Sequence, residues 1–307
     1  MSSKLVIAPV SSSTDTFKPD LFKGKVLFCT GGGSGICKEM TKAMMQHGAN
    51  ACIVGRKLDR ITESAKELSQ STGQTCIPAQ ADVRQPQQLK EAVANTVDKF
   101  GRIDFVICGA AGNFLASIDG MSENAFRTVM EIDTIGTFNT VKATLPYVRT
   151  THGAYIHVSA TLHYKGPRKC TPTFVILISS SGTPYQVHVS AAKAGVDALS
   201  AVLAVEEGPR GVRSNVIAPG PIADTEGMSR LSAKTGSSAK PYPLGRMGHV
   251  QDVANAAVFL FSGAASNITG QVLAVDGGIE HMRSFQLPYP QAVLDPDSIK
   301  HMIKPKL

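Results

Sequence analysis

A glycine-rich turn between the first apolar run and the first helical segment constrains this chain more than any other feature. The run at 25–30 predicts a buried strand, the sequence TGGGSGIC follows at 30–37, and the helical segment ends near Gly48. Glycines here permit a tight turn and a close approach of the backbone to a phosphate, which the first N–H groups of the helix can bind. The turn therefore predicts a nucleotide-binding cradle, with a merely flexible connection as the alternative. The residues expected to line this cradle are Thr30, Gly31, Gly33, Ser34, Gly35 and Ile36.

The remainder of the chain alternates short apolar runs with longer amphipathic segments. This alternation predicts βαβ crossovers, and hence an α/β fold with a doubly wound, Rossmann-type parallel sheet in a single domain. The domain is expected over 23–280, between a loose N-terminal arm at 1–22 and a C-terminal tail at 281–307. The expected strands lie at 25–30, 51–54, 76–80, 103–108, 154–159, 213–217 and 272–275. The first expected helix ends near 48, and the others lie at 58–71, 86–100, 123–147, 190–207 and 251–261.

Composition narrows the classes of function. The chain has 307 residues, 43% of them hydrophobic, but no apolar run reaches the roughly 18 residues that a membrane span needs. Its net charge of +7 suits an anionic ligand such as a phosphorylated cofactor or a CoA ester, and the basic residues form no long run that would indicate nucleic acid. The six cysteines form no CxxC pair, which predicts buried reduced thiols rather than disulfides or metal ligands, and no metal site is indicated.

The end of the second expected strand indicates which nucleotide is bound. Val54-Gly55-Arg56-Lys57 stands where an acidic residue would accept the ribose hydroxyls of NAD, and no acidic residue is present. The planar cation of Arg56 suits a 2′-phosphate instead. Lys57 either assists it or is a solvated surface charge. The sequence therefore predicts NADP(H) as the cofactor.

The TGxxxGI spacing of the turn resembles the short-chain dehydrogenase/reductase family, although Cys37 stands where that family usually has glycine. We expect this thiol to alter the packing without abolishing cofactor binding. The resemblance runs from about 23 to 278 and implies that Asp82 hydrogen-bonds the adenine. It also assigns to the cofactor site Val83 beside Asp82, Gly109 and Ala110 at a strand end, and Pro219, Gly220 and Ile222 in a turn at the nicotinamide carboxamide.

The catalytic set of that family is only partly present. Lys193 matches its lysine and Ser159 its serine, but Val189 occupies the position of the tyrosine and Asp133 that of an asparagine. A valine cannot exchange a proton with a carbonyl oxygen. The sequence therefore disfavours ketone reduction by the usual tyrosine mechanism.

The departures match a narrower group, the peroxisomal 2,4-dienoyl-CoA reductases. The motifs concerned are GNFL at 112–115, MEIDT at 130–134, SATL at 159–162, QVH at 186–188 and PGPI at 219–222. The resemblance implies NADPH-dependent reduction of 2,4-dienoyl-CoA to 3-enoyl-CoA in the β-oxidation of unsaturated fatty acids. An acyl-CoA is then the substrate, and the implied assembly is a homo-oligomer, specifically a tetramer.

The same resemblance implies roles for single residues. Asp133 would orient or protonate a water, with a purely structural pairing to Lys193 as the alternative. Lys193 would bind the nicotinamide ribose and add positive potential, and Asn113 would donate a hydrogen bond near the cofactor. Ser159 would contact the substrate or only pack. For His188 and Tyr185 we expect core or surface roles rather than catalysis.

Two segments do not follow the family pattern. About sixteen residues at 167–182 are inserted between the serine and lysine positions, and they include the β-prone run TFVILI at 173–178. This insertion is either translated intron or a genuine loop that covers the substrate or contacts another subunit. The chain ends Pro305-Lys306-Leu307, which is similar to import tripeptides of SKL type and predicts a peroxisomal protein read by the import receptor. If the tail is only a basic terminus, a cytoplasmic location is expected.

Two rival functions remain at this point. One is another NADP-dependent short-chain carbonyl reductase, which Val189 disfavours. The other is a catalytically inactive, cofactor-binding scaffold, which the insertion makes credible.

Overall fold

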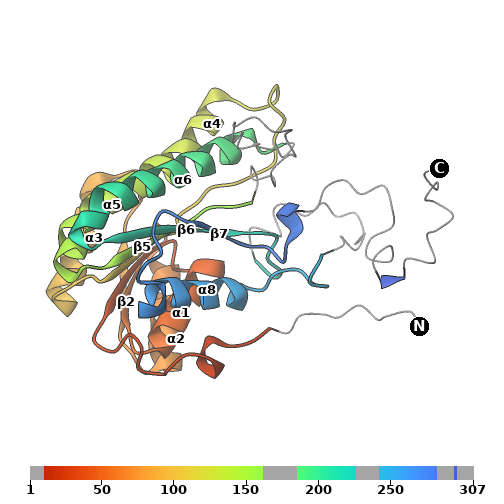
Figure 1. Cartoon of the computed structure of the whole chain (residues 1–307). Coiled ribbons are helices and arrows are strands. Elements are labelled where there is room, and N and C mark those ends of the chain that lie inside the picture. Colours follow the sequence, from red (N-terminus) through yellow and green to blue (C-terminus); the bar gives the residue numbers. More distant parts are fainter. Residues whose placement is uncertain (1–9, 162–184, 226–241, 282–293, 296–307) are drawn as a thin grey trace.

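Seven parallel strands form one sheet in the order β3-β2-β1-β4-β5-β6-β7 (Figure 1). The computed structural model describes residues 10–161, 185–225, 242–281 and 294–295. The doubly wound, single-domain fold predicted from the sequence is confirmed, whereas the insertion at 167–182 and the tripeptide Pro305-Lys306-Leu307 lie outside the described residues. The strands are β1 (Val26–Thr30), β2 (Asn50–Gly55), β3 (Cys76–Gln80), β4 (Phe105–Cys108), β5 (Ala154–Val158), β6 (Arg213–Pro219) and β7 (Val272–Val275).

Helices cover both faces of the sheet and enclose two separate cores (Figure 1). Successive residues of a strand point to opposite faces, so Leu27 and Cys29 join one core and Phe28 joins the other. One face carries α1 (Gly35–Gln46), α2 (Leu58–Thr72) and α8 (Val250–Phe261), and the other carries α3 (Pro86–Phe100), α4 (Glu123–Met130), α5 (Gly136–Thr151) and α6 (Val187–Glu207).

The helix predicted at 123–147 is interrupted where Asp133 stands. A π-helical turn, Glu131–Ile135, joins α4 to α5, and Asp133 within it is fully buried. Such turns occur mostly inside α-helices and frequently at functional sites, because the wider turn changes the direction in which a side chain points. The Thr137 hydroxyl donates a hydrogen bond of 2.6 Å to the Asp133 carbonyl and so satisfies part of the disturbed backbone.

The described part of the N-terminal arm, residues 10–22, makes contacts with the domain. Ser13 is buried and its hydroxyl lies 2.9 Å from Nε2 of His47, while Phe22 packs in the core on the α1 and α8 side. The Ser11 carbonyl accepts a hydrogen bond of 2.8 Å from the Asn255 amide. These are single contacts rather than a periodic pattern, so they could not be predicted from the sequence.

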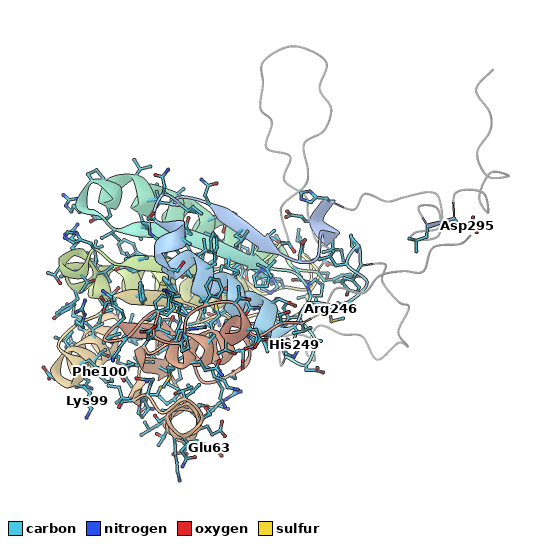
Figure 2. The ribbon with its side chains drawn as sticks, turned by 60° about the horizontal axis from the view of Figure 1, so that its bottom comes forward. Glu63, Lys99, Phe100, Arg246, His249 and Asp295 are labelled. Atoms are coloured by element: carbon cyan, nitrogen blue, oxygen red, sulfur yellow. The ribbon has the colours of Figure 1, made fainter. Side chains whose placement is uncertain are left out.

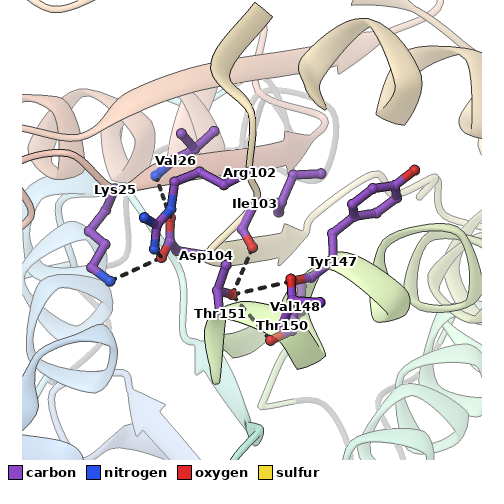
Figure 3. A network of polar contacts seen from close by, with 9 residues as sticks. All are labelled: Lys25, Val26, Arg102, Ile103, Asp104, Tyr147, Val148, Thr150 and Thr151. Carbon is purple, nitrogen blue, oxygen red and sulfur yellow. Dashed lines mark hydrogen bonds and ion pairs between the residues drawn. The ribbon is translucent and has the colours of Figure 1, made fainter. Parts of the chain in front are cut away.

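A charged cluster ties the amino ends of β1 and β4 together (Figure 3). The buried Asp104 carboxylate accepts a backbone hydrogen bond from Val26 at 3.0 Å, one from Lys25 Nζ at 3.0 Å, and two from the Arg102 guanidinium at 2.6 and 2.7 Å. Every carboxylate lone pair used here replaces a contact with water, which is what makes a buried charge tolerable. This end of the sheet is structural, and in open α/β sheets ligands bind at the opposite, carboxyl end.

Helix α6 and the turn that follows it, Val187–Arg210, are long and apolar enough by length and composition to cross a membrane. In the fold, this helix packs on β5, β6 and the π-helical turn and carries the buried Lys193. We interpret it as a core helix of the α/β domain.

A buried histidine in β5 predicts that the protein loses stability in acid. His157 is fully buried, its Nε2 lies 3.0 Å from the Ser214 hydroxyl, and burial lowers its pKa from 6.5 to about 4. Between these two pKa values, His157 is protonated in the unfolded chain but not in the folded chain. The free energy of unfolding therefore falls as the pH drops from 6.5 to 4. The full loss corresponds to about 3 kcal/mol. Urea unfolding across this pH range measures it.

His157→Gln removes the titrating group and serves as the control. The pH dependence between 6.5 and 4 should be shallower in this variant. An equal slope in both proteins would assign the acid sensitivity to other groups.

Candidate active site

The glycine-rich turn packs against the end of β4, as the predicted cradle requires. Gly31 has a φ of +74°, and a Cβ on it would lie 2.8 Å from the Gly109 carbonyl oxygen. The Thr30 hydroxyl accepts the backbone N–H groups of Gly109 at 3.1 Å and Ala110 at 3.4 Å. Only glycine fits the first position, because the conformation and the close approach both exclude a side chain.

The start of α1 leaves donors available for an anion. Ser34 is its N-cap residue, yet its side chain makes no capping hydrogen bond, and Gly35 with a φ of +54° has open space where a side chain would be. Gly33 packs near Ile61, and its carbonyl accepts a hydrogen bond of 3.0 Å from Ser64. Unpaired N–H groups at a helix start suit a pyrophosphate, so these residues fit a dinucleotide.

Cys37 occupies space that the missing side chain of Gly109 provides. A Cβ on Gly109 would lie 2.2 Å from the Cys37 Sγ, and this thiol contacts the Gly109 carbonyl at 3.7 Å. A hydrogen bond with Cys29 lowers the pKa of Cys37, whereas burial raises the pKa of Cys29. The thiol thus fits in the space that the absent side chain of Gly109 leaves. The five described cysteines are all buried and free.

The predicted adenine end of the site brings Arg56 and Asp82 to neighbouring strand ends. Arg84 grips the Asp82 carboxylate with hydrogen bonds of 2.6 to 3.1 Å and so lowers the pKa of Asp82. Arg56 is exposed, and Val83 is buried against Gly136. Sequence reasoning missed Arg84, although its place two residues after an aspartate that follows a strand was a usable signal.

Asp133 and Lys193 form a buried ion pair. Nζ of Lys193 lies 3.0 Å from Oδ2 of Asp133 and donates a hydrogen bond of 2.9 Å to the Val158 carbonyl. The Asp133 side chain is 0% exposed and the Lys193 side chain is 7% exposed. Oδ1 of Asp133 accepts the Gly112 N–H at 2.8 Å, while Oδ2 receives no aligned hydrogen bond, so its contact with the ammonium is electrostatic.

The position of the family tyrosine is apolar. Val189 is buried and packs with Val129, Ala192 and Met130 between α4 and α6. Among the described residues that pack around Val189, no proton donor replaces the missing tyrosine. This agrees with the expectation that the tyrosine mechanism does not operate.

Two further predicted residues lie at the same carboxyl end of the sheet. Ser159 is buried at the end of β5, and its N–H donates to the Ile217 carbonyl at 2.8 Å. Asn113 Nδ2 donates to Gln186 Oε1 at 3.4 Å, and its own Oδ1 has no partner among the described residues. The structure thus brings all four predicted catalytic residues to one region, which is where a doubly wound sheet binds ligands.

The turn after β6 is held from two sides. Gly220 lies so close to Asp276 that a Cβ on it would approach within 2.5 Å of that side chain, and Ile222 bridges to Gly248. The Arg246 guanidinium donates hydrogen bonds of 2.7 and 2.8 Å to the Asp252 carboxylate in the first turn of α8. Arg246 lies far from Lys99 and Phe100 at the end of α3 (Figure 2). This anchoring positions the three predicted residues Pro219, Gly220 and Ile222.

An apolar cavity of about 560 Å³, which sequence reasoning did not find, opens between α4 and the start of α6. It lies between the loop before α4, α4 itself and the first turn of α6. Met130 and Val187 bring it next to the π-helical turn and the start of α6. The residues lining it are Ile118, Met121, Ser122, Glu123, Phe126, Arg127, Met130 and Val187.

The chain is similar to known reductases over most of its length. A family model described as enoyl-(acyl carrier protein) reductase matches residues 31–280. A peroxisomal 2,4-dienoyl-CoA reductase of Saccharomyces cerevisiae is 45% identical over 286 residues, which cover 91% of this chain and 92% of that protein. A peroxisomal 2,4-dienoyl-CoA reductase of Danio rerio is 44% identical, with 86% of this chain and 84% of that protein covered.

Two solved structures of similar fold bear the name dehydrogenase. A short chain dehydrogenase from Bacillus anthracis has a TM-score of 0.72 at 34% identity and covers 86% of this chain and 99% of its own. The citronellol catabolism dehydrogenase of Pseudomonas aeruginosa has a TM-score of 0.73 at 28% identity, with 87% and 99% covered. The chain belongs to the short-chain dehydrogenase/reductase family, and over most of its length it is similar to peroxisomal 2,4-dienoyl-CoA reductases.

Proposed function

We propose that this protein reduces 2,4-dienoyl-CoA to 3-enoyl-CoA with NADPH. The observation that carries the proposal is the buried Asp133–Lys193 pair beside an apolar Val189, in a chain 45% identical to a peroxisomal 2,4-dienoyl-CoA reductase. Family membership supports a nicotinamide cofactor at the glycine-rich turn. The choice of NADPH rests on Arg56 and on the absence of an acid beside it.

The reaction needs an oxyanion to be stabilised and a proton to be supplied. When bound, NADPH supplies the hydride that adds to the δ-carbon of the conjugated thioester. Negative charge then develops on the thioester oxygen as a dienolate. Preorganised donors in a site closed to water stabilise such charge more strongly than solvent does.

Different residues of this chain bind the cofactor, position the water and hold the acyl chain. Lys193 holds the nicotinamide ribose and supplies positive potential, and its ammonium is fixed between the Val158 carbonyl and Asp133. Asp133 orients the water that protonates the α-carbon, since its Oδ2 has capacity for another hydrogen bond. Asn113 donates near the cofactor. The apolar cavity between α4 and the start of α6 suits part of the acyl chain.

The test is NADPH oxidation by the purified protein with 2,4-hexadienoyl-CoA and 2,4-decadienoyl-CoA, with the product identified by mass spectrometry and NMR. A version lacking 167–182 is run beside it. We expect turnover of at least one substrate to 3-enoyl-CoA and loss of turnover in Asp133→Ala. NADPH binding without turnover in both versions would instead favour the inactive scaffold.

Arg56→Leu is expected to weaken NADPH binding about 10-fold to 100-fold, because a charge-assisted hydrogen bond contributes about 1.5–3 kcal/mol. The dissociation constant for NADH should stay within about threefold, since NADH lacks the 2′-phosphate. Fluorescence titration measures both. Lys99→Leu removes an exposed charge at the far end of α3 and is the control (Figure 2). Equal weakening for both nucleotides would contradict the assigned role of Arg56.

Assembly and location extend the proposal. Large apolar side chains are exposed on α6 at Val202 and Val205 and on the π-helical turn and α5 at Ile135 and Phe138. These surfaces suit a homo-oligomer, specifically a tetramer, which light scattering tests. The peroxisomal names of the relatives support import of this chain through the receptor that reads Pro305-Lys306-Leu307. Deletion of the tripeptide should leave a fluorescent fusion in the cytoplasm.

A further inference from the structure

Buried polar atoms without partners gather around the ion pair. Among the described residues, Asn113 Oδ1, Asp133 Oδ2 and both ring nitrogens of His188 are buried and lack a hydrogen-bond partner. Each such atom costs about 1–3 kcal/mol if nothing satisfies it. Native proteins satisfy almost all buried polar atoms, by ordered water where protein atoms do not reach. Asp133 Oδ2 already faces the Lys193 ammonium at 3.0 Å, so Asn113 Oδ1 and the ring of His188 are the atoms that indicate a polar occupant.

His188 is held in a defined orientation there. It lies in the first turn of α6 and is fully buried, and its ring stacks on Phe114 with centroids 4.3 Å apart and planes 22° apart. Phe114 directly follows Asn113, which bonds to Gln186 of the same helix start. Packing thus fixes the ring plane, and neither nitrogen makes a well-aligned hydrogen bond, although the Phe114 backbone lies near enough to act on the ring. The sequence predicted a core or surface role, but a role in packing alone leaves these nitrogens unexplained.

The charge state of His188 suits a water ligand. Burial lowers its pKa, and the nearby Phe114 carbonyl and Asp133 carboxylate act in the opposite direction. The ring is therefore neutral at neutral pH, with one donor and one acceptor nitrogen. A buried water needs two to four polar partners, and the carboxylate, the imidazole and the amide oxygen provide them.

We propose that His188 is a positioning residue that holds, together with Asp133 Oδ2, the water that protonates the substrate. This inference rests on the proposed reduction of 2,4-dienoyl-CoA. After hydride adds to the δ-carbon, an O–H bond of the water breaks while a C–H bond forms at the α-carbon, and the dienolate returns to a thioester. The resulting hydroxide takes a proton from solvent, so each turnover consumes one hydride and one proton.

The experiment compares His188→Phe with His188→Gln. Phenylalanine keeps the stacking on Phe114 and removes both nitrogens, so we expect kcat to fall about 100-fold, within the range for lost proton-transfer assistance. KM for the dienoyl-CoA and the dissociation constant of NADPH should stay within about threefold. Glutamine restores a donor and an acceptor, and kcat should recover about tenfold. The solvent deuterium isotope effect on kcat should rise in His188→Phe, because proton delivery becomes slower.

His152→Asn is the matched control. His152 is exposed at the far end of α5 with a φ of 49°, a conformation that asparagine tolerates, so kcat should not change. Wild-type kcat in His188→Phe overturns the proposal. Equal kcat in His188→Phe and His188→Gln also overturns it, because the nitrogens then do not matter.

A crystal structure of the NADP⁺ complex gives a readout that does not depend on activity. We expect a water within hydrogen-bonding distance of both His188 and Asp133 Oδ2, and no such water in His188→Phe. If the wild type is active but this water is missing, the role of His188 fails and the proposed function stands. If the wild type reduces no dienoyl-CoA, the proposed function fails, and the role in proton delivery fails with it.

Discussion

Lys193→Met is expected to abolish measurable dienoyl-CoA reduction and to lower the free energy of unfolding by about 3–5 kcal/mol. The loss of stability follows because Asp133 is fully buried and Lys193 supplies the opposite charge 3.0 Å away. Once the ammonium is gone, the carboxylate keeps only the Gly112 hydrogen bond. The loss of activity follows because methionine can neither hold the nicotinamide ribose nor supply the positive potential proposed for Lys193. Urea unfolding and the steady-state assay measure the two effects.

The double variant Asp133→Asn with Lys193→Met separates stability from catalysis. It leaves no unpaired buried charge, so much of the lost stability should return, since removing one partner of a buried pair costs more than removing both. The turnover number should nevertheless stay below about 1% of the wild-type value, because both proposed roles are missing. A double variant as unstable as the single one would contradict the pairing argument. A double variant with substantial turnover would contradict the catalytic one.

Gly109→Ala is expected to destabilise the protein by about 2–3 kcal/mol and to weaken NADPH binding at least tenfold. The added Cβ would lie 2.2 Å from the Cys37 Sγ, and overpacking of this kind typically costs about 1–3 kcal/mol. Cys37 must move if this clash is to be removed. Cys37 lies in the first turn of α1, the helix whose N-terminus forms part of the cofactor cradle. Thermal unfolding and NADPH titration measure the two effects.

Cys37→Gly should rescue the clash. With glycine at 37, the space of the thiol is free for the alanine methyl group at 109. The pair Gly109→Ala with Cys37→Gly should then bind NADPH within about threefold of the wild type. A rescue of this kind, in which the effect of one substitution depends on the other, is expected only for residues in contact. Failure of the rescue would place the effect of Gly109→Ala in the backbone instead.

Gly208→Ala is the control for glycine replacement itself. No atom lies within 4 Å of the position that its Cβ would take, and its backbone is helical. This substitution should be neutral or slightly stabilising, because alanine loses less backbone entropy on folding.

Much of the sheet was predictable because strands and helices have local signatures. The run at 25–30 and the apolar face of α2, with Ile61, Ala65 and Leu68 buried, follow directly from periodicity. The interruption at Asp133 was not predictable, because a π-helical turn changes hydrogen bonding without changing hydrophobic spacing. The packing of Ser13 on His47 was equally hidden, since it depends on two residues 34 positions apart.

The site was predictable mainly where the glycine turn and the unusual residues Asp133 and Val189 stood in recognisable motifs. The separation between Asp133 and Lys193 follows from how α4, the π-helical turn and α6 pack, which no local pattern encodes. Arg84 was missed despite its place two residues after Asp82, and for His188 the sequence predicted only a core or surface role. Both residues are defined by their neighbours in the fold. Arg84 donates a hydrogen bond of 2.6 Å to the Asp82 carboxylate, and the His188 ring stacks on Phe114 with centroids 4.3 Å apart.

By itself, the amino-acid sequence determined the strand and helix order, the cofactor end of the sheet and the absence of a tyrosine at Val189, because backbone propensity and residue chemistry are local properties. Only the tertiary structure decided that Asp133 and Lys193 form a dry ion pair, that Cys37 fills the space beside Gly109, and that the nitrogens of His188 lack partners. Burial and pairing arise when distant segments exclude water together, and they exist only after the chain has folded.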